Sequence, residues 1–150
     1  MQRFRGYFEY SVDEKGRLNI PAKFRKVVSP EADETFVIVR GPNNCLQAFP
    51  QDGWSVFETE LDKRPTTPGT VKFKRHLYGS LSDSQLDGQG RITLSPQQLA
   101  VAGISKKAIM VGHGNYLEIW SPEKYQEYVG SGDDFDNVYF QSVQDSLKTP

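Results

Sequence analysis

The alternation of apolar and polar residues near the N-terminus predicts two short strands followed by a helix. Residues 6–12 alternate with period two, which is typical of a half-buried β-strand. Residues 13–16 carry the Asp and Gly of a turn, and strand-like alternation resumes over 18–20. Pro21 suits the first position of a short helix over 22–28, because its missing N–H would be unpaired there.

The rest of the chain predicts further strands and helices joined by short turns. Strands are expected over 35–40, 46–49, 80–86, 91–94, 107–112 and 116–120. Helices are expected over 51–61, 71–78, 96–101 and 122–129, with a loop over 65–70. From residue 130 the chain is acidic and has no sustained periodicity, so we expect an acidic mobile tail over 130–150.

The chain repeats itself. The segment D-E-K-G-R-L-N-I-P at 13–21 matches D-G-Q-G-R-I-T-L-S-P at 87–96, and both contain D-x-x-G-R followed by alternating apolar residues and a proline. Two later segments match in the same order: F-V-I-V-R-G with A-I-M-V-G-H, and C-L-Q-A-F-P-Q-D-G-W with Y-L-E-I-W-S-P-E-K-Y. Because such an ordered set is hard to obtain by chance, we infer an internal duplication.

Charge is distributed unevenly along the chain, although the formal net charge is only −1. Residues 1–28 carry seven cations against three acids, 63–75 carry five cations and no acid, and 118–150 carry seven acids against two lysines. Local clusters of cations favour a surface that faces a polyanion, because only local phosphate contacts release counterions. The alternative is that these runs are solvated faces.

The D-x-x-G-R motif places an aspartate and an arginine at the same end of a hairpin. In the first copy, the turn would bring the Asp13 carboxylate within reach of the Arg17 guanidinium. An arginine held in this way loses less side-chain freedom when it meets a phosphate or a guanine edge. Arginine is also the commonest reader of guanine in the major groove. Lys15 and Lys23 would then contact phosphates and position the protein without reading sequence.

The residues leave open whether each copy of the motif contacts DNA. Both Asp–Arg pairs can instead be structural turn clamps, in which case neither Arg17 nor Arg91 touches DNA. The second copy also has fewer cations, since Gln89, Gln97 and Gln98 stand where the first repeat has lysines or arginines. Our hypothesis is that Arg17 provides the main DNA contact and Arg91 a weaker or structural one.

Taken together, the motifs resemble the MraZ family of bacterial regulators. The resemblance covers about residues 4–128 and rests on F-R-G, D-x-K-G-R-L-x-I-P, C-L-x-x-F-P, L-x-G-S-x-S-D-S-Q-L-D-G-Q-G-R-I-x-L and V-G-H-G-N-Y-L-E-I-W. It implies an α+β, β-rich fold in which two SpoVT/AbrB-type halves, 7–54 and 80–125, form one pseudo-two-fold barrel. Short helices would flank this barrel, with a helical connector over 55–79. One departure is the extra pair of residues before F-R-G, which adds Arg3 to the N-terminal arm.

The same resemblance implies a transcriptional regulator that binds double-stranded DNA in the cytoplasm, at the nucleoid. It implies a ring-shaped homo-oligomer that binds direct repeats in the promoter of its own cell-division and cell-wall gene cluster. The residues expected to contact DNA are Arg17, Lys15, Arg3, Arg5, Lys23 and Arg91. The residues expected to support the motif are Asp13, Gly16, Asp87 and Gly90.

The sequence does not indicate an enzyme, a metal site or a cofactor. His76 and His113 have no metal-ligand spacing, and no G-x-S-x-G or phosphate-binding loop has the required context. Cys45 lies in an apolar run and is expected in the core. No run approaches the roughly 20 apolar residues of a membrane span, and the charged N-terminus lacks the apolar segment of a signal peptide. We therefore expect neither a membrane partner nor a small-molecule substrate.

A protein-interaction role is the main alternative. AbrB-like folds also occur in antitoxins, which use an acidic tail to neutralise a toxin. The tail of this chain combines acidic and aromatic residues: Asp133, Asp134, Phe135, Asp136, Tyr139 and Phe140. Such antitoxins usually have one module rather than two fused copies, which favours the DNA-binding interpretation. Three aromatic residues on predicted helices are candidates for subunit contacts or, more commonly, core packing: Trp54, Phe57 and Tyr125.

Overall fold

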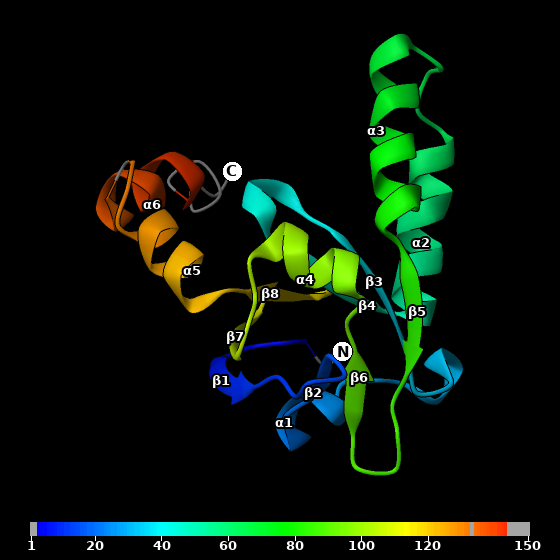
Figure 1. The fold of residues 1–150 in the computed structure, drawn as a ribbon. Coiled ribbons are helices and arrows are strands. Elements are labelled where there is room, and N and C mark those ends of the chain that lie inside the picture. Colours follow the sequence, from blue (N-terminus) through cyan, green and yellow to red (C-terminus); the bar gives the residue numbers. More distant parts are fainter. Residues whose placement is uncertain (1–2, 133, 144–150) are drawn as a thin grey trace.

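Antiparallel strand pairing organises the protein (Figure 1). The structure is a computed structural model, and it describes residues 3–132 and 134–143. Its strands are β1 (Tyr7–Ser11), β2 (Arg17–Asn19), β3 (Thr35–Arg40), β4 (Leu46–Pro50), β5 (Ser82–Gln85), β6 (Arg91–Thr93), β7 (Lys107–Gly112) and β8 (Leu117–Trp120). Its helices are α1 (Ala22–Arg25), α2 (Gln51–Asp62), α3 (Pro68–Ser80), α4 (Pro96–Ala102), α5 (Pro122–Val129) and α6 (Phe135–Val143), with 3₁₀ turns at Pro30–Ala32 and Pro42–Asn44. Each strand expected from the sequence overlaps one of these strands.

The two repeats exchange strands with each other. The six-stranded sheet has the order β1-β7-β8-β4-β3-β5, and neighbouring strands are antiparallel. β1, from the first repeat, pairs with β7 of the second, whereas β5, from the second repeat, pairs with β3 of the first. β2 and β6 pair with each other across the repeats. The segments 7–54 and 80–125 are therefore repeats of sequence that fold as one structural unit.

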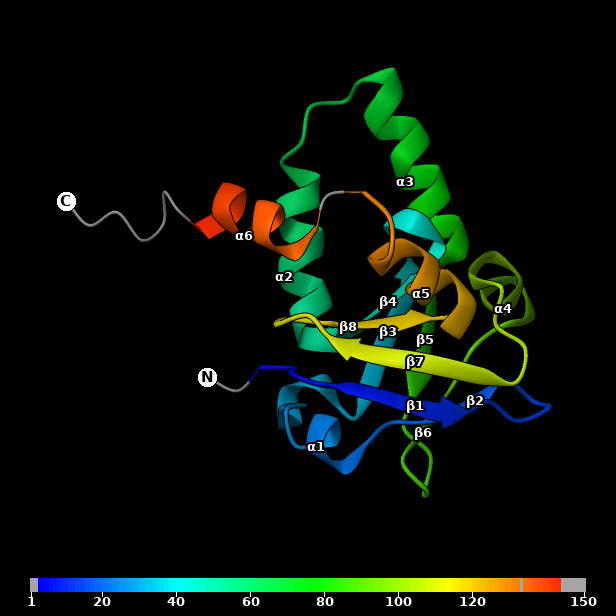
Figure 2. The same ribbon diagram turned by 90° about the vertical axis from the view of Figure 1, so that its left-hand side faces the viewer.

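The expected α+β class is confirmed, but the described strands do not close into a barrel. β1 and β5 are the edges of the six-stranded sheet, and β2 and β6 form a separate two-stranded sheet (Figure 2). β2 and β6 are only three residues long, and a single isolated bridge, Val12 to Leu18, joins β1 to β2. On the other side, the Thr93 N–H of β6 donates to the Ser84 hydroxyl of β5 at 2.8 Å. These links are too few to continue the ladder from one sheet into the other.

One hydrophobic core serves both repeats. Leu18 and Ile92 are partners in the β2–β6 pair, and both are fully buried. Phe36 and Ile38 of β3 lie in the same cluster as Met110 of β7, which comes from the other repeat. Full burial of one such side chain contributes about 1.5–3 kcal/mol relative to exposure. Because residues of both repeats bury one another here, this main core belongs to both halves.

α2 and α3 form a helical hairpin that packs on the face of β3 and β4 opposite the main core (Figure 1). Val37 points away from the main core and packs in a second cluster with Trp54 and Leu61, so Trp54 has a core role. The Tyr78 hydroxyl of α3 donates to the Glu58 carboxylate of α2 at 2.7 Å. This hydrogen bond raises the pKa of Tyr78 to about 12, because an ionised Tyr78 could no longer donate to the Glu58 carboxylate and would place a second negative charge beside it.

α3 begins earlier than the sequence pattern predicts. The helix expected over 71–78 starts at Pro68, so the loop prediction for 65–70 is wrong for its last three residues. The Thr67 hydroxyl accepts from the Thr70 N–H at 3.1 Å, and the Thr70 hydroxyl accepts from the Thr67 N–H at 2.8 Å. A capping box ordinarily carries Glu or Gln at this third helical position, so a threonine pair gives no standard signature.

The acidic tail contains a helix that the sequence pattern does not predict. The expectation of an aperiodic segment over 130–150 is wrong for α6. The Asp134 carboxylate accepts from the Asn137 N–H at 2.9 Å, which is the arrangement of an N-cap. Phe135 and Tyr139, one helical turn apart, have ring centroids separated by 5.9 Å. The mobility of the tail stays a prediction, and residues 133 and 144–150 lie outside the described residues.

A third cluster lies beneath α5 and contains Cys45. The cysteine is fully buried beside Ile109 and Trp120, which confirms the expectation of a core position. Burial, together with the Glu118 carboxylate, raises the pKa of the thiol to about 12. Tyr125 packs against the buried Trp120 with ring centroids 5.6 Å apart, and its ring also lies 5.7 Å from that of the exposed Tyr7, so it lies at the border of this cluster.

Candidate nucleic-acid interface

The first D-x-x-G-R motif forms a tight turn around the Asp13 carboxylate. Its Oδ1 accepts hydrogen bonds from the N–H groups of Lys15 at 2.9 Å and Arg17 at 2.8 Å. Its Oδ2 accepts from Arg17 Nε at 2.6 Å. Gly16 has a φ of 78°, which a residue without Cβ adopts at no steric cost. One side chain therefore holds both the backbone of the turn and the arginine that follows it.

The second motif repeats this geometry. Asp87 Oδ1 accepts from the N–H groups of Gln89 and Arg91, both at 2.9 Å, and Oδ2 accepts from Arg91 Nε at 2.7 Å. Gly90 has a φ of 75°. The predicted proximity of aspartate and arginine is thus confirmed in both copies.

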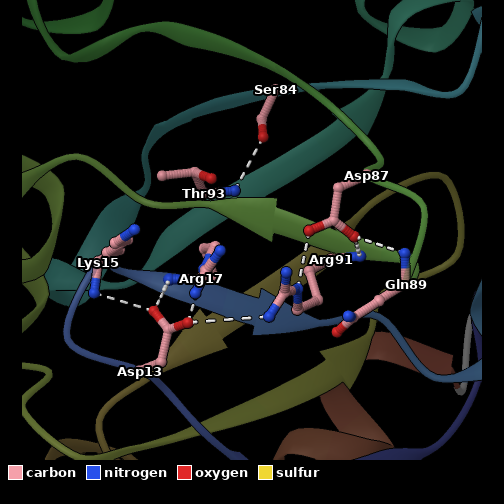
Figure 3. Close-up of polar contacts among 8 residues, drawn as sticks. All are labelled: Asp13, Lys15, Arg17, Ser84, Asp87, Gln89, Arg91 and Thr93. Atoms are coloured by element: carbon pink, nitrogen blue, oxygen red, sulfur yellow. Dashed lines mark hydrogen bonds and ion pairs between the residues drawn. The ribbon is translucent and has the colours of Figure 1, made fainter.

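The two hairpins lie side by side, with β2 and β6 forming one antiparallel ribbon (Figure 3). Hydrogen bonds extend this pairing at both ends. The Leu94 N–H donates to the Gly16 carbonyl at 2.8 Å, and the Ile20 N–H donates to the Gly90 carbonyl at 2.9 Å. Each glycine of the motif thus accepts a backbone hydrogen bond from the other repeat, so the two turns are held on a single surface.

Asp13 also faces the arginine of the other repeat. Arg91 Nη1 lies 3.9 Å from Asp13 Oδ2, in addition to its bond with Asp87. Figure 3 shows the Arg91 side chain reaching between the two carboxylates. The side chain of Arg91 is 21% exposed and that of Arg17 is 35% exposed, so Arg17 is the more accessible of the two.

Both carboxylates are stabilised in their ionised form. The pKa of Asp13 lies below its ordinary value chiefly because the Arg17 N–H donates to it; desolvation opposes this, and the Arg17 side chain and the Lys15 N–H lower it further. The pKa of Asp87 is lowered in the same way, chiefly by the Arg91 N–H. At neutral pH each aspartate is therefore a fixed anion that orients its arginine.

The structure separates the predicted DNA contacts into two places. Lys15 lies exposed in the first turn, close to Arg17. Arg3 and Lys23 lie instead at the start of β1: Arg3 Nη1 donates to the Asn115 side chain at 3.0 Å, and the Lys23 ammonium lies beside Gly6. The exposed Arg5 belongs to the same end of β1, because it directly precedes Gly6 in the chain. β1 spans roughly 16 Å at about 3.3 Å per residue, so these three cations lie on a separate part of the surface.

Arg25 is a cation of the second hairpin that the sequence reasoning missed. Its Nη1 donates to the Ile20 carbonyl at 2.6 Å. The guanidinium covers Gly90, where an added Cβ would lie 2.6 Å from Nη1. The first repeat therefore supplies a cation to the second hairpin. The sequence indicated this cation only through the cluster of basic residues over 23–26, and that cluster does not show which hairpin a given side chain contacts.

Gln98 is not a surface counterpart of the cations in the first repeat. It is 1% exposed, and its Nε2 donates to the Ser80 carbonyl at 2.8 Å while its Oε1 accepts from the Ser95 N–H at 2.9 Å. The first turn has the exposed Lys15 where the second has Gln89, but it also has the exposed Glu14 where the second has Gly88, so the two turns have the same formal charge.

The surface offers two forked cations at fixed positions on adjacent strands. A guanidinium whose Nε is held by a carboxylate retains Nη donors for a phosphate or a base edge. A two-stranded ribbon is also narrow enough for the major groove of B-DNA. Within the described part of the chain, His, Cys, Asp and Glu side chains do not gather in threes as metal ligands would. Nor does any described helix have the length and apolar character to cross a bilayer.

Comparison with known proteins adds an independent observation. A family model described as "MraZ protein, putative antitoxin-like" matches residues 3–74 and 78–138. The chain is 40% identical over 126 residues to the "Transcriptional regulator MraZ" of Syntrophomonas wolfei, with 83% of this chain and 85% of the relative covered. It is 34% identical over 137 residues to the protein of that name from Ligilactobacillus salivarius, with 90% of this chain and 93% of the relative covered. The corresponding protein of Lactobacillus delbrueckii is 35% identical over 143 residues, covering 95% of each chain.

Proposed function

Because this chain belongs to the MraZ family, we propose that it is a transcriptional regulator that binds specific double-stranded DNA through its two D-x-x-G-R hairpins. The observation that carries the proposal is the pair of adjacent Asp–Arg clamps, which holds Arg17 and Arg91 on one ribbon. The protein acts by binding, not as an enzyme. Its place of action is the cytoplasm, at the nucleoid.

Within this surface, Arg17 reads a base edge and Lys15 contacts a phosphate. Arg17 is the more exposed arginine, and Lys15 stands in the same turn. A bidentate arginine–guanine contact supplies about 1–3 kcal/mol of discrimination against the wrong base. A lysine–phosphate contact instead strengthens binding to every sequence alike. Arg91, which two carboxylates hold, makes the weaker contact.

Arg3, Arg5 and Lys23 bind the DNA backbone beside the base-reading contact. They lie at the start of β1, whereas Arg17 lies beyond its end. Phosphates of one strand follow each other every ~3.4 Å along the helix axis, so the roughly 16 Å of β1 corresponds to about five phosphates. These cations position the protein and carry no sequence information.

The chain assembles with copies of itself into a ring and binds direct repeats in the promoter of its own cell-division and cell-wall gene cluster. A cyclic assembly presents every Arg17 surface in the same sense around the ring. Neighbouring copies therefore match sites that are repeated in one direction. Linked sites raise the effective concentration of each further contact, so several weak contacts add up to one tight complex.

A DNA-binding titration tests this proposal. The probe is a fluorescent duplex with the region upstream of the chain's own gene, and a scrambled duplex of the same composition is the reference. Wild type should bind the upstream duplex more tightly than the scrambled one. In Arg17→Ala the ratio of these two affinities should fall by about 5- to 150-fold, because the guanine contact is lost. Arg91→Ala should lose less, because Arg91 makes the weaker contact.

Two further variants separate sequence reading from general attraction. Arg40→Ala removes a cation of β3 that bonds the Asn44 side chain and belongs to neither hairpin, so it should bind like wild type. Lys15→Ala should weaken binding to both duplexes and reduce the slope of affinity against salt by about one. If wild type and Arg17→Ala bound both duplexes equally, the motif would be a turn clamp and not a reader of DNA.

A further inference from the structure

The ribbon of β2 and β6 presents four side chains on its outer face. Both strands have the same burial pattern: a partly buried arginine, a buried aliphatic residue and an exposed polar residue. Successive side chains of a strand point to opposite faces, so Arg17 and Asn19 share a face of β2. For the same reason Arg91 and Thr93 share a face of β6. The aliphatic residue between each pair is fully buried, so the polar face is the outer one.

The register places each of the two polar residues opposite an arginine. Arg17 pairs with Thr93, and Asn19 pairs with Arg91. Directly opposite residues of an antiparallel pair point to the same face, with Cβ atoms about 4.5–5.5 Å apart. Figure 3 shows Arg17 and Thr93 on facing strands. Each end of the outer face therefore combines one arginine with one small polar side chain.

Asn19 and Thr93 have polar groups that are available for binding. Both residues are exposed. Within residues 3–132 and 134–143, neither the Asn19 amide nor the Thr93 hydroxyl makes a hydrogen bond, and the bond from Thr93 to Ser84 uses the backbone N–H. The arginines opposite them are oriented by Asp13 and Asp87. An unpaired amide and an unpaired hydroxyl thus lie beside two oriented guanidinium groups.

We propose that Asn19 and Thr93 read bases next to the arginines and make the two ends of the ribbon specific for different base pairs. The inference rests on the proposed function, with this ribbon in the major groove. An asparagine amide forms a bidentate pair with N6 and N7 of adenine, and a threonine methyl group contacts the methyl group of thymine. The Asn19 end therefore selects adenine beside the base that Arg91 contacts. The Thr93 end selects thymine beside the guanine that Arg17 contacts.

The difference between Asn19 and Thr93 gives the ribbon a direction on DNA. The two residues occupy equivalent positions of the duplication, because each lies two residues after the arginine of its motif. A ribbon with identical residues at both positions would present the same groups at each end and would match a site with two-fold symmetry. With asparagine at one end and threonine at the other, a given site is matched in one orientation. Sites repeated in one direction then bind every ribbon in the same orientation.

Base-pair scanning of the upstream duplex tests this inference. Footprinting locates the segment that wild type protects, and each base pair of that segment is then changed in turn in competition titrations. Asn19→Ala should lose discrimination at one A·T pair by about 5- to 150-fold and keep it at the other positions. Its slope of affinity against salt should equal that of wild type, because a neutral side chain releases no counterions. Thr93→Ala should lose a smaller preference for thymine at a different position.

Making the two ends identical tests the direction of binding. Asn19→Thr places threonine at both ends, and Thr93→Asn places asparagine at both ends. Each variant should therefore bind a site with two-fold symmetry more tightly than the wild-type site, whereas wild type should have the opposite preference. Asn19→Thr also protects against misfolding, because threonine favours strands. Circular dichroism melts of both variants should match that of wild type.

Asn137→Ala is the matched control, because it removes an exposed asparagine of α6 outside the ribbon and should leave every base preference unchanged. The inference is wrong if Asn19→Ala keeps the wild-type preference at every base pair, or if it weakens binding to all duplexes alike. In either case the preference of wild type for the upstream over the scrambled duplex would still support the proposed function. A wild-type chain that binds both duplexes equally would overturn the proposed function and this inference together.

Discussion

The Arg91 guanidinium lies 3.9 Å from the Asp13 carboxylate of the other repeat, while its Nε bonds Asp87 at 2.7 Å. Among the described residues Arg17 has only one such partner, since its ion pair is with Asp13 alone. The duplication is therefore not symmetrical in its interactions. Asp13 holds arginines of both hairpins, whereas Asp87 holds one, and Arg91 is the less exposed of the two arginines.

This asymmetry predicts that Asp13→Asn weakens DNA binding more than Asp87→Asn does. The change at Asp13 removes the charge that faces both arginines, and the change at Asp87 affects one. We expect Asp13→Asn to lose about two- to five-fold in affinity, in the range of exposed ion pairs, and Asp87→Asn to lose less. Titration of the upstream duplex measures both variants. A larger loss for Asp87→Asn would show that the second hairpin makes the main contact.

The contribution of the clamps to stability should be constant near neutral pH and disappear in acid. The folded pKa of Asp13 and of Asp87 lies below the ordinary value. A carboxyl group of this kind stabilises the fold fully above its unfolded pKa of about 3.9, and the contribution is lost as pH falls through the folded pKa. The difference in Tm between wild type and a doubly substituted Asp13→Asn, Asp87→Asn chain should therefore be flat between about pH 8 and 5 and shrink below about pH 4. Circular dichroism melts measure it, and a change between pH 8 and 6 would contradict the assignment.

Gly16→Ala should destabilise the protein strongly, whereas Gly88→Ala should be tolerated. Gly16 has a φ of 78°, and a Cβ there would collide with the Leu94 carbonyl oxygen. This oxygen belongs to the backbone and cannot move aside as a flexible side chain could. The left-handed conformation alone costs a residue with Cβ about 1–2 kcal/mol, and the collision adds to this. Gly88 lies in the second turn, has open space around it and is not among the glycines with positive φ. Urea unfolding compares the two variants, and equal midpoints would rule out this role of Gly16.

Gln98→Leu should lower the free energy of unfolding by about 1–3 kcal/mol, the cost of leaving buried polar groups without partners. The Gln98 amide donates to the Ser80 carbonyl and the Ser82 hydroxyl, so it joins α4 to the segment that links α3 with β5. Gln97→Leu is the matched control, because the neighbouring glutamine is exposed and should change stability by no more than about 0.5 kcal/mol. Chemical denaturation measures both, and similar values for the two variants would mean that this network contributes nothing.

The sequence by itself determined the local elements, the duplication and the Asp–Arg clamp. The clamp could be predicted because all of its parts lie within five consecutive positions, from Asp13 to Arg17, and turn chemistry acts over that distance. The core position of Cys45 followed from the apolar run around it. The helix α6 was missed because its aromatic stripe is short and stands in a segment whose composition is that of a disordered tail.

Only the tertiary structure decided how these elements combine. Alternating residues of one strand fit several partners, because the pattern states which face is buried and not which strand lies beside it. The exchange of β1 and β5 between the repeats, and the open sheet in place of a barrel, were therefore beyond the sequence pattern. The same holds for Arg25, which lies against Gly90, and for Gln98, whose polar side chain is buried. Contacts between residues far apart in the chain depend on the packing of the whole molecule, and no local spacing encodes them.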